Sequence, residues 1–386
     1  MSAFAIKGWC PSALRPMPSG DGLVVRLRPR GGRLSSEQAA GIAELAARNG
    51  NGLIDLTGRA NLQIRGVSEA SYEPLIEGLD RLGLVDAELQ SETQRNILAA
   101  PFWTEGDDTF SLVAELEHAL AGRSLGLPEK FGFAVDCGAA RVLAQAPADI
   151  RIERGLGGSL IVRADGAPKG RLVAREKAVD IALSLAEWFV ASGGASGGRG
   201  RMAAHVAAAR LPDDFAGEMQ PAPALAPPKP GLVSVGALVG FAFGQLQSET
   251  LANLATLAPG LRLTPWRMML VEGLRAMPQH EGLVTRAEDP LLRVVACTGA
   301  PVCPQAHAET RELAAALAPH ILANVRLHVS GCPKGCAHPA PSALTLVGTP
   351  YGFDLVRDGT PRDVPAMRGL AREKILADPG VLSGAR

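Results

Sequence analysis

The chain has 386 residues, enough for two or three domains with substantial hydrophobic cores. Its 39 basic residues balance its 39 acidic residues, which argues against a general nucleic-acid binder. Residues 1–17 carry no signal- or transit-peptide pattern, and no apolar run approaches membrane-spanning length. We therefore expect a cytoplasmic protein without a membrane or nucleic-acid partner.

The first predicted elements form a strand–helix–strand–strand unit. The strand spans residues 24–29, the helix lies within 34–50, and a strand pair follows within 52–67. Ser35 or Ser36 can cap the helix, and Asn49-Gly50 can end it. Such a unit is half of a ferredoxin-like domain and cannot bury its sheet face alone.

The same pattern recurs in the second half of the chain. A strand at 232–238 precedes a helix within 246–260, for which Ser248 is the expected cap, and a strand pair lies within 260–274. A different strand-rich module follows each copy, so that 130–138 parallels 324–332. The repeat predicts an α+β fold with two ferredoxin-like half-domains and two α/β iron–sulfur-type domains, related by a pseudo-twofold axis with the site between the halves.

The expected boundaries follow from this repeat. The ferredoxin-like half-domains are residues 1–82 and 232–285, the modules that follow them are 88–215 and 288–386, and 216–231 is a Pro-rich linker. A second low-complexity stretch, 192–201, lacks the ending of a phosphate-binding loop, so a linker is again favoured. No Gly-x-Gly-x-x-Gly fingerprint follows a strand, so the electrons are expected from a separate donor.

Four of the six cysteines form two close pairs in the last quarter of the chain. They are Cys297, Cys303, Cys332 and Cys336. Four thiolates on two Gly- and Pro-rich loops predict a 4Fe–4S cluster. The nearby His307 and His338 keep a zinc site open as the alternative. The isolated Cys10 and Cys137 are expected to be small buried apolar residues.

The duplicated half-domains and the cysteine pairs resemble the nitrite and sulfite reductase superfamily over nearly the whole chain. The resemblance implies anion-binding roles for basic residues in three stretches. Thr57, Arg59 and Gln63 match the first stretch, Arg95 and Asn96 match the second, and Lys130 and Phe131 begin the third. Gly132 stands where those reductases carry a second lysine, which lowers the positive charge over the cofactor face.

Residues 7–29 and the form CPKGCAHP at 332–339 most resemble the precorrin-3B synthases of aerobic cobalamin biosynthesis. The resemblance implies oxygen-dependent hydroxylation of precorrin-3A at C20, with closure of a γ-lactone. The tetrapyrrole substrate would replace sirohaem in the cleft. A sirohaem-dependent sulfite or nitrite reductase is one alternative. A non-catalytic tetrapyrrole-binding or electron-carrier iron–sulfur protein is the other.

Precorrins carry acetate and propionate groups around the ring, so the cleft must offer carboxylate partners. Bidentate arginines are well suited to this task. The candidate substrate contacts are Arg26, Arg28, Arg59, Gln63, Arg65, Arg95, Asn96, Lys130 and Lys334.

Oxygen chemistry implies a further mononuclear non-haem iron, of the kind commonly held by histidines and a carboxylate. His307, His338, Asp136 and Cys137 are expected near the cleft, but the sequence assigns no iron ligand. The electron donor is expected to be an external carrier protein or an NAD(P)H-dependent reductase.

Overall fold

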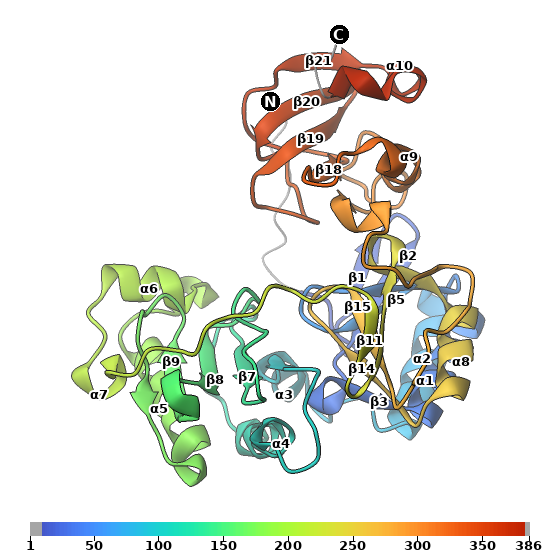
Figure 1. Cartoon of the computed structure of the whole chain (residues 1–386). Coiled ribbons are helices and arrows are strands. Elements are labelled where there is room, and N and C mark those ends of the chain that lie inside the picture. The colour runs from blue at the N-terminus through green and yellow to red at the C-terminus, as the bar shows by residue number, and fades with distance from the viewer. Residues whose placement is uncertain (1–9, 383–386) are drawn as a thin grey trace.

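The computed structural model describes residues 10–382 as two central sheets flanked by two smaller lobes (Figure 1). The first reductase-type lobe comprises residues 97–216 and the second comprises residues 290–382. The α+β architecture expected from the repeat is confirmed. In the described part of the chain, no helix is long and apolar enough to cross a membrane.

The first central sheet is built mainly from the N-terminal copy and is antiparallel throughout. Two helices, α1 (Ser36–Asn49) and α2 (Glu69–Arg81), belong to the same copy. The strand order is β1 (Met17–Ser19), β2 (Gly22–Leu27), β5 (Leu62–Val67), β4 (Leu53–Leu56) and β13 (Gln245–Gln247).

The second central sheet repeats this order in the later copy, which carries helix α8 (Ser248–Leu257). Its strands are β11 (Gly231–Val233), β12 (Gly236–Phe241), β15 (Met268–Glu272), β14 (Gly260–Leu263) and β3 (Arg33–Ser35), with β16 (Leu283–Val284) also pairing with β12.

The two copies exchange one short strand each. Strand β13 of the later copy pairs with β4 of the first, and β3 of the first copy pairs with β14 of the later one. Val25 and Ile42 from one half share a hydrophobic core with Leu251 and Val271 from the other. The two half-domains are therefore joined by hydrogen bonds and by a common core.

The N-terminal capping residue that the sequence predicts is confirmed for helix α1 and is wrong for helix α8. Ser35 caps α1 in a reciprocal capping box with Gln38, as expected. The prediction for Ser248 is wrong, because Ser248 is the first residue of α8 and the cap position is Gln247. The exchanged strand explains the shift, since the Ser248 N–H donates to the Gly52 carbonyl (2.8 Å) of the other copy.

The two reductase-type lobes share one topology, in which three parallel strands are followed by antiparallel ones. This match confirms the second repeated module. The first sheet contains β6 (Ile97–Ala99), β7 (Phe133–Asp136), β8 (Ile150–Arg154), β9 (Leu160–Ala164) and β10 (Arg171–Leu172). The second contains β17 (Val294–Ala296), β18 (Leu327–Ser330), β19 (Ser342–Thr349), β20 (Gly352–Gly359) and β21 (Met367–Leu370).

The helices of the lobes are mostly short. Those in or beside the first lobe are α3 (Leu89–Gln94), α4 (Asp108–Leu120), α5 (Ala178–Ala191), α6 (Met202–Ala208) and α7 (Asp213–Ala216). The second lobe contains α9 (Arg311–Leu317) and α10 (Arg372–Ala377). Figure 1 shows the segment after α7 crossing from the first lobe to the central sheets.

That crossing segment is anchored rather than free. The Ala222 N–H donates to the Arg154 carbonyl and the Leu225 N–H to the Arg141 carbonyl, both at 2.9 Å. Part of the Pro-rich linker expected at 216–231 is therefore hydrogen-bonded along the first lobe.

Candidate active site

A cleft lies between the first central sheet and the second reductase-type lobe, and it contains two adjoining cavities. The smaller, about 290 Å³, is lined by Arg26 and Gln63 on one side and by Cys297 and Cys336 on the other. The larger, about 500 Å³, shares Arg26 and Gln63 and adds four candidate residues. These are Arg65, Lys130, Cys303 and Lys334. The cleft therefore brings basic side chains from one copy to the cysteines of the other.

The four paired cysteines gather at the carboxyl ends of β17 and β18, on loops 297–303 and 332–336. All four are free thiols. Burial raises the pKa of Cys332 and of Cys336, and interactions with the other cysteine thiols raise both further. The sequence-distant pairs are thus close enough to act on each other's charge.

Tight packing shapes these cysteine loops. Gly299 has a φ of +77°, and a Cβ there would lie 2.6 Å from Thr310 Oγ1. The N-terminal hairpin binds the first loop, because the Gly20 N–H and the Ser19 hydroxyl both donate to the Val302 carbonyl, at 2.7 and 2.9 Å. The loop 297–303 is therefore held from both sides of the cleft.

The four thiols are the donor set that bears on the expected metal centre. Sulfur ligands around one zinc ion sit about 2.3 Å from the metal, and so within about 4 Å of one another. Across residues 10–382, no three His, Cys, Asp or Glu side chains converge to hold a single metal ion. Cys332 and Cys336 each feel the charge of Cys297 and Cys303, so the four thiols from two loops lie near one another, as the corners of an iron–sulfur cube require. The chemistry of this donor set fits a 4Fe–4S cluster.

Arg26 and Arg65 point into the cleft from neighbouring strands. Gln63 Oε1 accepts hydrogen bonds from Arg26 Nε (3.1 Å) and Nη2 (2.7 Å), which fixes the guanidinium. Burial lowers the pKa of Arg26. Arg65 is already paired, with Asp21 at 2.7 Å. Arg26 is consequently better placed than Arg65 to receive a substrate carboxylate.

Arg59 lines neither cavity, but it follows Thr57 and Gly58, which line the smaller one. Its Nη2 donates to the Lys130 carbonyl at 3.0 Å, and among the described residues its buried Nη1 finds no hydrogen-bond partner. Burial, assisted by the charge of Arg201, lowers the pKa of Arg59 to about 10. A half-buried cation with one buried, unused donor is suited to bind an anion.

Cys10 was not expected in this neighbourhood. Its thiol lies close enough to Arg26 to oppose the lowering of the Arg26 pKa by burial. The backbone N–H of Cys10 donates to Glu129 at 2.9 Å, and the residue is only half-buried. The prediction of a buried apolar residue is therefore wrong for Cys10. The sequence spacing around Cys10 could not have indicated this position, because its neighbours Arg26 and Glu129 come from other segments of the chain.

Arg95, Asn96 and Arg28 are held away from both cavities. Arg95 is buried, with Nη2 2.6 Å from Asp86 and Nη1 donating to the Arg28 carbonyl at 2.7 Å. Arg28 donates in turn to the Glu92 carbonyl. Asn96 donates to the Phe131 carbonyl at 2.8 Å. This geometry favours structural roles over the predicted substrate contacts of Arg28, Arg95 and Asn96.

Gly132 leaves no space for a lysine. A Cβ at this position would lie 2.8 Å from Asn96 Nδ2 and 2.9 Å from the Asn96 carbonyl oxygen. The Gly132 N–H donates to Asp149 at 3.0 Å, which fixes the backbone. The lysine of the reductases is therefore absent at position 132, and the close packing against Asn96 would not admit its side chain.

The four residues considered near an oxygen-activating iron do not line the cleft cavities. Asp136 and Cys137 lie in the first reductase-type lobe, while His307 is exposed and His338 packs edge-on against His328 at 5.9 Å. The expected location is therefore corrected for Asp136 and Cys137, whereas His338 follows Ala337, which lines the smaller cavity. The repeat separates these residues, since Asp136 and Cys137 belong to the copy without the paired cysteines.

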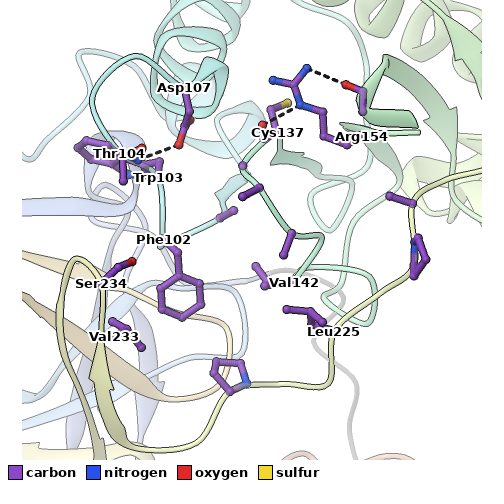
Figure 2. A pocket seen from close by; sticks show the side chains of 18 of the residues that line it. Phe102, Trp103, Thr104, Asp107, Cys137, Val142, Arg154, Leu225, Val233 and Ser234 are labelled. Carbon is purple, nitrogen blue, oxygen red and sulfur yellow. Dashed lines mark hydrogen bonds between the residues drawn. The ribbon is translucent and has the colours of Figure 1, made fainter. Parts of the chain in front are cut away.

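Cys137 lines a cavity of about 940 Å³ at the position that the cysteine loops occupy in the other copy. Figure 2 shows Phe102 and Trp103 on one side and Arg154 near Cys137, with Arg154 Nε donating to the Cys137 carbonyl at 2.9 Å. Cys137 is buried, as expected, and burial raises the pKa of its thiol. A protonated, solitary thiol is poorly suited to hold a cluster.

Asp136 should make stability depend on pH. Burial raises its pKa from 3.8 to about 6, although backbone N–H groups of Leu143 and Val142 oppose the shift. Folding then favours the protonated form, so this contribution to stability falls as pH rises from about 4 to 6, by up to about 3 kcal/mol. Urea unfolding of wild type and Asp136→Asn across this range should show the variant gaining relative stability. Parallel pH profiles would contradict this.

Comparisons with known proteins agree with this architecture. Residues 15–82 match the nitrite/sulfite reductase ferredoxin-like half domain. A ferredoxin–nitrite reductase from Synechococcus elongatus is 28% identical, covering 88% of this chain and 78% of the relative. The structure of the Mycobacterium tuberculosis NirA protein superposes with a TM-score of 0.64 at 17% identity, covering 92% of this chain and 79% of that one. The fold and site thus define a member of the nitrite/sulfite reductase superfamily.

A more specific assignment comes from a precorrin-3B synthase of Sinorhizobium sp. It is 30% identical, and the alignment covers 93% of this chain and 84% of the relative. The chain belongs to the precorrin-3B synthase family and is an oxidoreductase.

Proposed function

We propose that the chain hydroxylates precorrin-3A at C20 with molecular oxygen and closes a γ-lactone, as a precorrin-3B synthase. One oxygen atom enters the product, and the other leaves as water with two electrons and two protons from an external donor. The observation that carries the proposal is the shared lining of the cleft. Arg26 and Gln63 face Cys297 and Cys336 across one cavity, and Lys130 and Lys334 extend the basic lining into the next.

In this proposal, Cys297, Cys303, Cys332 and Cys336 hold a 4Fe–4S cluster, which supplies electrons one at a time when bound. Oxygen activation would require the further mononuclear iron. The described residues present no three-ligand site for it, so we assign no residue to that role.

The residues of the chain bind and orient the substrate. Gln63 holds the Arg26 guanidinium toward the cleft, and the Lys130 carbonyl holds that of Arg59 while leaving Nη1 unused. Both groups are poorly hydrated, so a substrate carboxylate would replace missing solvent contacts with charge-assisted hydrogen bonds. Lys130 is exposed and Lys334 is half-buried, which places them toward the rim of the site.

Arg26→Ala and Arg59→Ala should each weaken tetrapyrrole binding. A shielded arginine–carboxylate contact contributes roughly 1.5–3 kcal/mol, so dissociation constants should rise about ten- to a hundred-fold. Arg→Lys should restore only part of the loss, because an ammonium lacks the two-pronged geometry. Absorbance titration would measure this, with Arg48→Ala as control because Arg48 pairs with Glu44 on the exposed surface of α1. Unchanged affinity in both cleft variants would place the substrate elsewhere.

Isotopically labelled oxygen gas tests the reaction itself. Mass spectrometry should find one labelled oxygen atom in the product from precorrin-3A, and none when the label is supplied in water. A product labelled from water would overturn the oxygenase proposal. Robust sulfite reduction by the protein supplied with sirohaem and an artificial donor would instead favour the reductase alternative, against which the crowding at Gly132 argues.

A further inference from the structure

His328 touches the proposed cluster site without being one of its ligands. It lies in β18, the middle one of the three parallel strands in the second reductase-type lobe, paired with Val295 on one side and Thr345 on the other. The side chain is fully buried. Its Nε2 lies 3.6 Å from Cys297 Sγ, which is a hydrogen-bonding distance for the large sulfur atom. The sheet therefore fixes an imidazole against one cysteine.

We propose that His328 is a positioning residue whose Nε2–H donates a hydrogen bond to the Cys297 thiolate and raises the reduction potential of the cluster. This inference rests on the cluster of the proposed function. Hydrogen bonds to ligand sulfur stabilise the more negatively charged reduced state, so they raise the potential.

The partners of the ring determine where its proton sits. In the described structure, the buried Nδ1 of His328 has no hydrogen-bond partner. A proton on Nδ1 would leave a buried donor unsatisfied and aim the Nε2 lone pair at a thiolate. A proton on Nε2 removes both costs. The tautomer that donates to Cys297 is therefore the favoured one.

Ser330 is the other polar side chain near this sulfur, but its proton is already used. Its Oγ lies 3.4 Å from Cys297 Sγ, and it donates to the Cys332 carbonyl at 2.7 Å. A hydroxyl has one proton, so Ser330 cannot donate to both partners at once. This difference supplies a matched control two residues away on the same strand.

Redox titration followed by electron paramagnetic resonance would test the role of His328. His328→Leu should lower the equilibrium constant for one-electron reduction of the cluster at least tenfold. This change corresponds to a midpoint potential that is lower by about 59 mV or more. His328→Gln, which keeps an N–H donor, should recover part of the shift. Ser330→Ala should change the potential much less. Equal potentials in wild type and His328→Leu, with iron and sulfide retained, would overturn the inference, as would equal shifts in Ser330→Ala and His328→Leu.

A measurement on the unmodified chain covers the case in which His328→Leu fails to fold or to hold iron. Pulsed electron paramagnetic resonance of wild type grown with nitrogen-15 histidine should detect coupling between a histidine nitrogen and the reduced cluster. Absence of that coupling would overturn the role of His328. A wild-type protein reconstituted with iron and sulfide that holds no cluster would overturn the cluster proposal itself, and this outcome is distinct from an unchanged potential.

Discussion

Replacing any one of Cys297, Cys303, Cys332 or Cys336 by serine should abolish the brown chromophore and most of the bound iron and sulfide. Each thiolate occupies one corner of the proposed cluster, and serine oxygen is a poor ligand for it. The protein should also become less soluble, because the cysteine loops lose the centre around which they pack. Iron and acid-labile sulfide assays, together with visible absorbance, would measure the loss.

The two other cysteines supply the control. Cys137→Ser and Cys10→Ser should retain wild-type iron and sulfide content, because Cys137 lies in the other lobe and Cys10 contacts Arg26. Loss of iron from Cys137→Ser equal to that from Cys303→Ser would show that the ligand set is wrong. Full iron content in any of the four ligand variants would remove that cysteine from the set.

Arg95→Ala should lower the free energy of unfolding by about 3 kcal/mol. Removing one partner of a buried ion pair costs about 3–5 kcal/mol, because the remaining charge is left without compensation. The side chains of Arg95 and Asp86 are each only 7% exposed. The lower end of the range applies, since Arg30 also contacts Asp86 at 3.0 Å and retains some compensation. Urea unfolding monitored by circular dichroism would measure the change.

Arg30→Ala is the matched control, because it removes a different arginine from the same carboxylate. The Arg30 side chain is 58% exposed, so its contribution should be at most about 1 kcal/mol. Equal destabilisation by the two variants would contradict the distinction between buried and surface pairs. Tetrapyrrole affinity of folded Arg95→Ala close to that of wild type would support a structural role for Arg95.

The duplicated architecture was predictable because it depends on local patterns. Hydrophobic periodicity and turn residues mark each strand–helix–strand–strand unit, and the same patterns recur in both halves. The cysteine spacing likewise identified the loops that gather beside β17 and β18. The exchanged strands β3 and β13 were not predictable, because three-residue strands carry little periodic signal and pair with segments far away in the sequence.

The candidate site was predictable only where a residue's role follows from its place in a motif. Thr57, Gln63 and Lys130 come from stretches that the resemblance singled out, and they line the cleft cavities; their binding roles stay predictions. Arg95 shares that motif evidence, yet its guanidinium is directed to Asp86 by contacts between distant segments. Cys10 and His328 could not be identified from sequence spacing, because their roles depend on residues that are distant in the sequence. Cys10 lies near Arg26, and His328 lies near Cys297.

The reciprocal pairing of β3 and β13 has the form of a domain swap within a single polypeptide. Two separate copies of the ancestral half would complete their sheets only as a symmetric dimer, each lending one edge strand to the other. A dimer of identical chains carries two identical sites, whereas a fused chain lets its copies diverge. One copy here holds four clustered cysteines, and the other holds Cys137 beside a cavity of about 940 Å³. A single chain can therefore place paired cysteines in one copy and leave the equivalent position of the other open as a cavity.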